Sequence, residues 1–109
     1  HAEHAPSITL SMQELLFTIS RGHLAVTREL LEGGADPNVK DKLGRTPLWL
    51  ATDENNKEVV QTLCEAGAMT NLEGPEGRTP LHLAARKGLS DIAEILLRHR
   101  AQVDGNPDK

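Results

Sequence analysis

The sequence predicts an all-α solenoid in which short helix-turn-helix units stack in a single row. The first observation is a repeat: Gly-Arg-Thr-Pro-Leu occurs at residues 44–48 and again at residues 77–81, 33 residues later. The second is composition, because 38% of the residues are hydrophobic but only 2% are aromatic. A core of thin Leu, Val, Ile and Ala layers needs few large rings, which fits a fold whose units contact only their neighbours.

A shared register runs through the chain. Leu30, Leu63 and Leu96 lie 33 residues apart, and Thr-Pro-Leu-His-Leu-Ala occupies residues 79–84. A period of this length with this motif is typical of ankyrin repeats, and roughly residues 12–104 resemble that family. The resemblance implies an ankyrin-repeat solenoid with projecting β-hairpin loops. It divides the chain into a linker or tag remnant at residues 1–10 and three repeats at residues 11–43, 44–76 and 77–109.

In the first unit, Ser11 and Glu14 are spaced as a capping box, which predicts that a helix begins there. Apolar residues at helical spacing continue this helix to Gly22, and a second helix is expected over residues 24–31. The unit lacks the repeated Gly-Arg-Thr-Pro-Leu string, which favours a capping role. A degenerate internal repeat, with Phe17 on its first helix, is the alternative.

The second and third units share one plan. Thr46 and Thr79 precede a Pro at the first helical position, where the missing N–H costs nothing. We expect helices at residues 46–54, 57–65, 79–87 and 90–97. The stretches at residues 34–46 and 67–79 are rich in turn residues, and the resemblance implies that each forms a hairpin.

The turns inside the units require an unusual backbone conformation. Gly22 and Gly88 stand where the first helix reverses, and Asn55 takes this place in the second unit. Gly adopts positive φ most readily, and Asn is the next best tolerated residue there. Glycine also follows the second helix of the first two units, whereas Arg100 stands at that place in the third. This last turn is therefore expected to be looser.

The second helix of the third unit is strongly apolar, with Ile92, Ile95, Leu96 and Leu97. A terminal unit should instead show a polar outer face, since no neighbour covers it. We therefore expect the array to continue beyond Lys109 in a longer protein, and the chain to be a monomer or to self-associate weakly through exposed repeat ends. A natural end, kept in solution by the basic residues that follow Leu97, is the alternative.

Composition argues against several classes of function. The net charge is −4, with both signs scattered, so no basic stripe marks a nucleic-acid binder. No apolar run approaches the ~18 residues that span a bilayer. Cys64 is the single cysteine, which suits a reducing compartment. We expect an intracellular protein, cytoplasmic or nuclear, that binds no nucleic acid and does not insert into membranes.

No residue pattern predicts catalysis, a cofactor or a small-molecule substrate. The family resemblance implies that His82 hydrogen-bonds the Thr79 hydroxyl and supports the fold. His1 and His4 flank an acid but lack further preorganised ligands, so no metal site is predicted. Cys64 holds a core position, and the glycines of residues 74–77 lack the Lys-Ser/Thr of a phosphate loop.

Trp49 and Asn38 each allow two interpretations. Trp49 replaces the motif histidine in the second unit, so its ring either packs between units or reaches the groove as an aromatic anchor. Asn38 is similar to asparagines that are hydroxylated in this family, but Pro37 stands where Val is typical. Turn formation is therefore the expected role of Asn38.

The resemblance implies a protein-binding surface made by hairpin tips and inner helices. Its expected contact residues are Lys42, Leu43, Arg45, Trp49, Asp53, Glu54, Glu76, Arg78, Arg86 and Lys87. These residues alternate in charge and include an apolar tip at Leu43. They predict a non-catalytic interaction module for a protein or peptide of mixed charge. The alternative is an architectural spacer within a larger protein.

Overall fold

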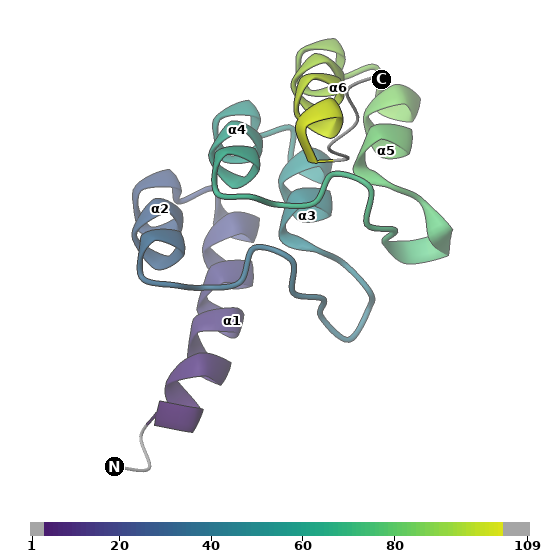
Figure 1. Cartoon of the computed structure of the whole chain (residues 1–109). Coiled ribbons are helices and arrows are strands. Elements are labelled where there is room, and N and C mark those ends of the chain that lie inside the picture. Colours follow the sequence, from purple (N-terminus) through teal and green to yellow (C-terminus); the bar gives the residue numbers. More distant parts are fainter. Residues whose placement is uncertain (1–3, 104–109) are drawn as a thin grey trace.

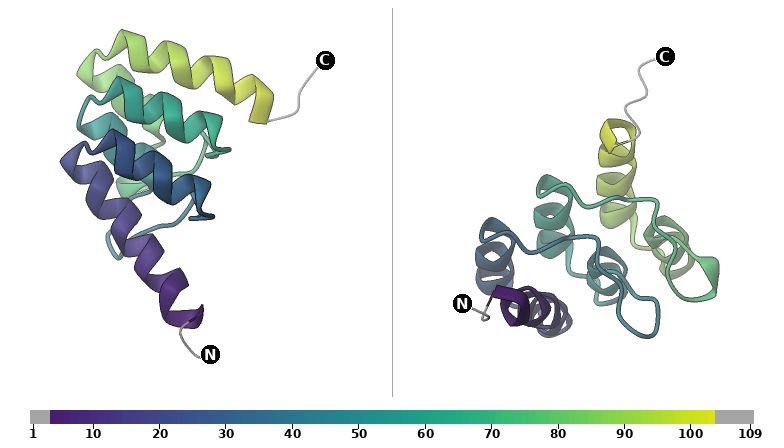
Figure 2. Two further views of the ribbon diagram at one scale, coloured as in Figure 1. Left: turned by 90° about the vertical axis from the view of Figure 1, so that its left-hand side faces the viewer. Right: turned by 60° about the horizontal axis from the view of Figure 1, so that its bottom comes forward.

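Three helix pairs stack in a row (Figure 1). The computed structural model describes the backbone of residues 4–103 and the side chains of residues 13–100. Within that part the pairs are α1 (His4–Arg21) with α2 (Leu24–Glu32), α3 (Pro47–Asp53) with α4 (Lys57–Glu65), and α5 (Pro80–Lys87) with α6 (Ser90–Val103). Helices α1, α3 and α5 form the inner row, and α2, α4 and α6 form the outer row (Figure 2). The predicted all-α solenoid is confirmed.

The inner helices begin as the sequence predicts. The Thr46 hydroxyl accepts a hydrogen bond from the backbone N–H of Trp49 at 3.1 Å. The Thr79 hydroxyl accepts one from His82 at 3.3 Å, while Nδ1 of His82 accepts from the Thr79 N–H at 3.0 Å. This reciprocal arrangement is a capping box with histidine as its second member. The expected structural contact of His82 with Thr79 is confirmed.

The reversals between paired helices have the expected left-handed backbone. Gly22 and Gly88 have φ of 74° and 73°. Asn55, at the equivalent place in the second unit, has φ of 56°. Because Asn tolerates this conformation better than other side chains do, the second unit reverses without a glycine.

One apolar core runs through all three units. Equivalent leucines at positions 63 and 96 are fully buried, as are Val59 and Ile92. Ile95 and Leu96 are also buried, and of the four apolar residues expected to form an uncovered end only Leu97 is exposed. The expectation of a broad apolar face on α6 is therefore corrected. Most of these side chains point into the stack.

Both ends of the array are more helical than expected. Helix α1 begins at His4, before Ser11, so residues 4–10 are helical and not a linker. Helix α6 continues through Arg100 to Val103, whereas α2 and α4 have nine residues each. An Arg has no tendency towards the left-handed turn that glycine makes in the other units, and it favours helix. His1, and the side chains of His4 and Ser11, lie outside the described residues.

The two loops between units project from the same side of the stack (Figure 2). We call residues 33–46 the first hairpin and residues 66–79 the second hairpin. Neither contains a β-strand within the described part of the chain, and each reverses through tight turns. The side-chain oxygen of Asn38 accepts a hydrogen bond from the Met69 N–H at 2.7 Å, which ties the two hairpins together. Asn38 thus links the units as well as forming its own turn with Asp36.

Candidate partner-binding surface

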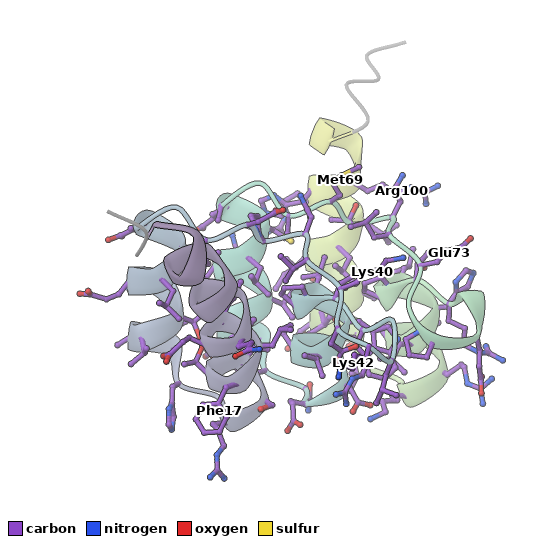
Figure 3. All side chains as sticks on the ribbon, turned by 90° about the horizontal axis from the view of Figure 1, so that it is seen from below. Phe17, Lys40, Lys42, Met69, Glu73 and Arg100 are labelled. Carbon is purple, nitrogen blue, oxygen red and sulfur yellow. The ribbon has the colours of Figure 1, made fainter. Side chains whose placement is uncertain are left out.

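The ten residues expected to contact a partner come from two kinds of element. Five lie on the hairpins, four lie on the inner helices α3 and α5, and Glu54 caps the end of α3. Viewed from below, the hairpins form an exposed rim, with Lys42 on the first and Glu73 on the second (Figure 3). The fold therefore brings the two groups to one side of the molecule. How each side chain is held decides what it can offer a partner.

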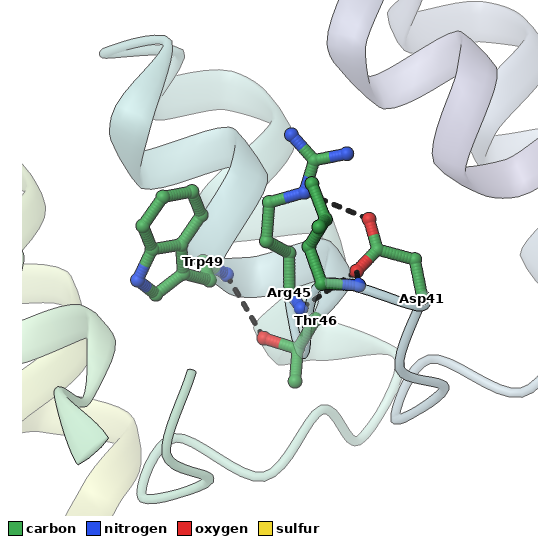
Figure 4. Close-up of polar contacts among 5 residues, drawn as sticks. Asp41, Arg45, Thr46 and Trp49 are labelled. Carbon is green, nitrogen blue, oxygen red and sulfur yellow. Dashed lines mark hydrogen bonds and ion pairs between the residues drawn. The ribbon is translucent and has the colours of Figure 1, made fainter. Parts of the chain in front are cut away.

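Asp41 organises the tip of the first hairpin (Figure 4). One carboxylate oxygen accepts hydrogen bonds from the backbone N–H groups of Leu43 and Arg45, at 3.0 and 2.8 Å. The other oxygen pairs with Nε of Arg45 at 2.7 Å. The Asp41 N–H donates to the Arg45 carbonyl, and the Gly44 N–H to the Asp41 carbonyl. Five polar contacts within five residues hold this turn in one conformation.

The charge of Asp41 is favoured by these contacts. Partial burial of its carboxylate acts to raise its pKa. The hydrogen bonds and positive charge of Arg45, with the Leu43 N–H, outweigh that effect and lower the pKa of Asp41. Asp41 is therefore ionised at neutral pH, as its acceptor role requires. Sequence reasoning placed Arg45 on the partner surface but did not identify Asp41 as the residue that positions it.

Leu43 is the most exposed large apolar side chain on this rim. It is 66% exposed, between the exposed Lys42 and the half-buried Gly44 at the tip. The expectation of an exposed apolar tip is confirmed. Since Asp41 fixes the backbone on both sides of Leu43, the side chain is presented with little conformational freedom to lose on binding.

The second hairpin turns by different means. The Gly74 N–H donates to the Arg78 carbonyl at 2.7 Å, and the Gly77 N–H to the Gly74 carbonyl at 3.1 Å. Glu76 lies at the tip with φ of 63°. Its carboxylate pairs with Nε of Arg78 at 3.4 Å, on an exposed surface. Gly74 holds the position of Asp41, so this tip lacks the side-chain acceptor that orders the first.

Trp49 explains the glycine at position 74. A Cβ on Gly74 would lie 2.5 Å from Cδ1 of Trp49, a distance that real contacts do not allow. The indole is half-buried and packs against the core, with its edge on the second hairpin. Its N–H is buried and has no hydrogen-bond partner within the described part of the chain. Of the two interpretations of Trp49, the contacts favour a packing role, against the core and the second hairpin, and a direct contact with a partner stays a prediction.

The inner helices carry the remaining charges. Nζ of Lys87 on α5 lies 2.9 Å from a carboxylate oxygen of Asp53 and donates to the Asp53 carbonyl at 3.0 Å. These two residues were expected to offer opposite charges to a partner, but they pair with each other across the units. Glu54 and Arg86 are exposed and form no ion pair within the described residues, so they offer charge more directly.

One feature of the inner row was missed by sequence reasoning. The guanidinium of Arg21 lies 5.3 Å from the ring centre of Phe17, a cation–π contact on α1. Spacing of four residues on one helix is the signal that would have found it. Phe17 points outward from α1 (Figure 3).

A shallow hollow of about 490 Å³ lies on the outer row, spanning α2, α4 and α6. Charged side chains of both signs line it, including Glu65 and Arg98. Lys57 and Asp91, also on its wall, pair at 3.5 Å across α4 and α6. An ion pair thus links the second and third units on the outer row, as the Asp53–Lys87 pair does on the inner row.

The described residues offer little for other chemistry. Burial and the nearby Glu65 raise the pKa of the Cys64 thiol to about 11, so it is protonated in the core at neutral pH. No group of His, Cys, Asp and Glu side chains in this part of the chain is arranged to hold a metal. No helix within residues 4–103 is both long and apolar enough to cross a membrane.

Comparison with known proteins identifies the architecture. The family model described as "Ankyrin repeats (3 copies)" matches residues 15–106. Protein HOS4 of Saccharomyces cerevisiae is 43% identical over 51 residues, a stretch that covers 43% of this chain and 5% of HOS4. The chain therefore spans only a small part of that relative. With the family model matching most of its length, the chain belongs to the ankyrin-repeat family.

Proposed function

We propose that this chain is a non-catalytic module that binds a protein or peptide through the hairpin tips and the exposed ends of the inner helices. Ankyrin repeats are in general protein–protein interaction modules. The observation that carries the proposal for this surface is the first hairpin, where the Asp41 contacts present Leu43 at 66% exposure.

The physical argument is preorganisation. An exposed leucine contributes ~1–2 kcal/mol when a partner covers it. That gain is reduced when binding must also order the loop that carries the side chain. The Asp41 contacts have already ordered this loop, so more of the gain from covering Leu43 becomes affinity.

The charges support a partner of mixed sign. Lys42 and Arg86 supply exposed positive charge, and Glu54 supplies negative charge. Asp53 and Lys87 neutralise each other, so a partner that uses either of them must first compete with a 2.9 Å contact. We therefore place Lys42, Leu43 and Arg86 at the centre of the proposed surface, with the other predicted residues around them.

The test compares two matched double variants of the purified chain in affinity capture from a cell extract. Lys42→Ala/Leu43→Ala alters the proposed surface, and Glu58→Ala/Gln61→Ala alters the outer row to a similar extent. We expect proteins retained by the wild type and the outer-row variant to be lost from the hairpin variant. Identical sets of captured proteins for all three would contradict the proposal and favour the architectural spacer. Circular dichroism of each variant verifies that it is folded.

The same proposal includes an intracellular setting. The chain has a single cysteine and so forms no internal disulfide, which suits a compartment in which cysteines stay reduced. Fluorescence microscopy of a tagged chain in its native cells tests this part. Secretion into the medium would contradict it.

A further inference from the structure

The first unit exposes an apolar surface that its counterparts bury. Phe17 is 55% exposed, whereas Leu50, at the equivalent position, is 5% exposed. Val26 is 45% exposed, whereas Val59, its equivalent, is fully buried. In the third unit the equivalent residues are Leu83, which is half-buried, and Ile92, which is buried. Phe17 and Val26 thus form one half of an inter-unit interface, which we call the N-terminal face.

The third unit exposes the complementary half. Leu97 is 51% exposed, whereas Cys64, its equivalent in the second unit, is 6% exposed. Ala85 is exposed, whereas its equivalent Thr52 is fully buried. In the first unit the equivalent residues are Leu31, which is half-buried, and Ile19, which is buried. Leu97 and Ala85 form the C-terminal face.

We propose that two copies of this 109-residue chain stack head to tail, so that the C-terminal face of one copy covers the N-terminal face of the next in the place that a further repeat would take. The interface would repeat, in the same 33-residue register, the one already formed twice inside the chain, where α1 packs on α3 and α3 on α5. Such stacking sets Leu97 and Ala85 against Phe17 and Val26. Because the two faces differ, the contact does not close on itself and allows further copies to add.

The outer row adds charge complementarity. Glu65 of α4 and Arg98 of α6 line one hollow across an internal boundary. The register sets Arg98 of one copy opposite Glu32 of the next, again a base against an acid. Glu29 is exposed on α2 where the other units bury Thr62 and Ile95, so stacking would desolvate its carboxylate and would weaken the contact unless a base such as Arg98 pairs with it.

The inner row opposes the contact at one point. Asp53 pairs with Lys87 at 2.9 Å across the internal boundary. The same register places Arg86, the equivalent of Asp53, against Arg21, the equivalent of Lys87. This like-charged contact weakens the stack, so we expect association only at high protein concentration.

Analytical ultracentrifugation of the whole chain over a range of concentrations tests the proposal. We expect the average mass of the wild type to rise with concentration. Phe17→Glu and Leu97→Glu each place a charge on one exposed face and should each remain monomeric. An equimolar mixture of the two should form a dimer and stop there, because each variant keeps the face that the other lacks. Circular dichroism verifies that both variants fold, as expected for substitutions at exposed positions.

Arg86→Asp sharpens the test. The new Asp would face Arg21 of the next copy, as Asp53 faces Lys87 inside the chain. This pair should tighten association roughly fivefold, and the gain should be lost at high salt. The proposal is overturned if both the wild type and Arg86→Asp stay monomeric at every concentration. It is also overturned if Leu97→Glu still associates alone while Phe17→Glu does not, because that result shows two N-terminal faces pairing with each other.

Discussion

The two hairpins have the same length and place in the repeat, but they are ordered in different ways. In the first, the Asp41 carboxylate accepts from two backbone N–H groups and pairs with Arg45. In the second, Gly74 takes the place of Asp41 and leaves room for the Trp49 ring. One turn is held by its own polar side chain, and the other packs against Trp49 of the helix that precedes it, α3.

This difference shows that two positions in the repeat depend on each other. A side chain at position 74 and an indole at position 49 occupy the same space. The second unit thus exchanges a polar turn for an apolar contact between its hairpin and its own first helix, α3. The exchange leaves the Trp49 N–H buried without a partner in the described part of the chain, which makes the contact less favourable than its area indicates.

The largest expected effect on stability comes from disrupting the second hairpin, which packs against Trp49. Gly74→Ala places a methyl group 2.5 Å from Cδ1 of Trp49, so ring or loop must shift. We expect the free energy of unfolding to fall by about 1–3 kcal/mol, the range for overpacked sites. Urea unfolding followed by circular dichroism measures this change.

Gly33→Ala is the matched control for Gly74→Ala. Gly33 also has negative φ, and its added Cβ would meet the Glu29 carbonyl at 3.4 Å, close to ordinary contact. We expect it to change stability by no more than about 0.5 kcal/mol. Adding Trp49→His to Gly74→Ala should recover part of the loss. Equal losses with and without Trp49 would show that the two positions are independent.

Substitutions in the first hairpin, which is held by the Asp41 contacts, should reduce stability less. Asp41→Ala removes the acceptor for two backbone N–H groups, and we expect a loss of about 1–2 kcal/mol in the free energy of unfolding. Asp41→Asn keeps an oxygen acceptor but loses the charge, so its loss should be smaller. A larger loss for Asn than for Ala would contradict the assigned role of Asp41.

The contribution of the first hairpin to stability should also depend on pH. The pKa of Asp41 is lowered in the folded protein, so its charged form is favoured by folding. Its contribution is fully present above the pKa of the unfolded chain, about 4, and is lost as pH falls through the lowered folded value. The stability difference between wild type and Asp41→Asn should therefore shrink in acid. A difference that grows below pH ~4 would contradict this sign.

The sequence was sufficient to predict the repeat and most of the helices, because period, capping threonines and turn glycines are local signals. Asn55 is a good example, since its left-handed backbone follows from its place between two glycines in the register. The ends were predicted less well. Helix α6 passes through Arg100 because nothing in that residue stops a helix, although the register assigns a turn there.

The candidate surface was predictable by position but not by pairing. Leu43 is exposed as expected, since a hairpin tip has nothing to cover it. The pairing of Asp53 with Lys87 depends on which residues of neighbouring inner helices face each other, and that requires the stacking geometry. The contact between Trp49 and Gly74 is also non-local. The 33-residue register contained its signal, because both positions depart from the pattern of the other units.

The smallest expected effect concerns the pair that links the second and third units. Asp53 and Lys87 are 39% and 42% exposed, so their attraction is screened by water and salt. In a double-mutant cycle with Asp53→Asn and Lys87→Met, we expect a coupling of about 0.5 kcal/mol or less, smaller at high salt. Lys87→Met should destabilise more than Asp53→Asn, because Lys87 also donates to the Asp53 carbonyl, which the Asn variant retains. A coupling energy well above 1 kcal/mol would contradict this expectation and would mean that the pair contributes substantially to holding the second and third units together. A weak pair, by contrast, separates at small cost, which leaves both charges within reach of a bound partner.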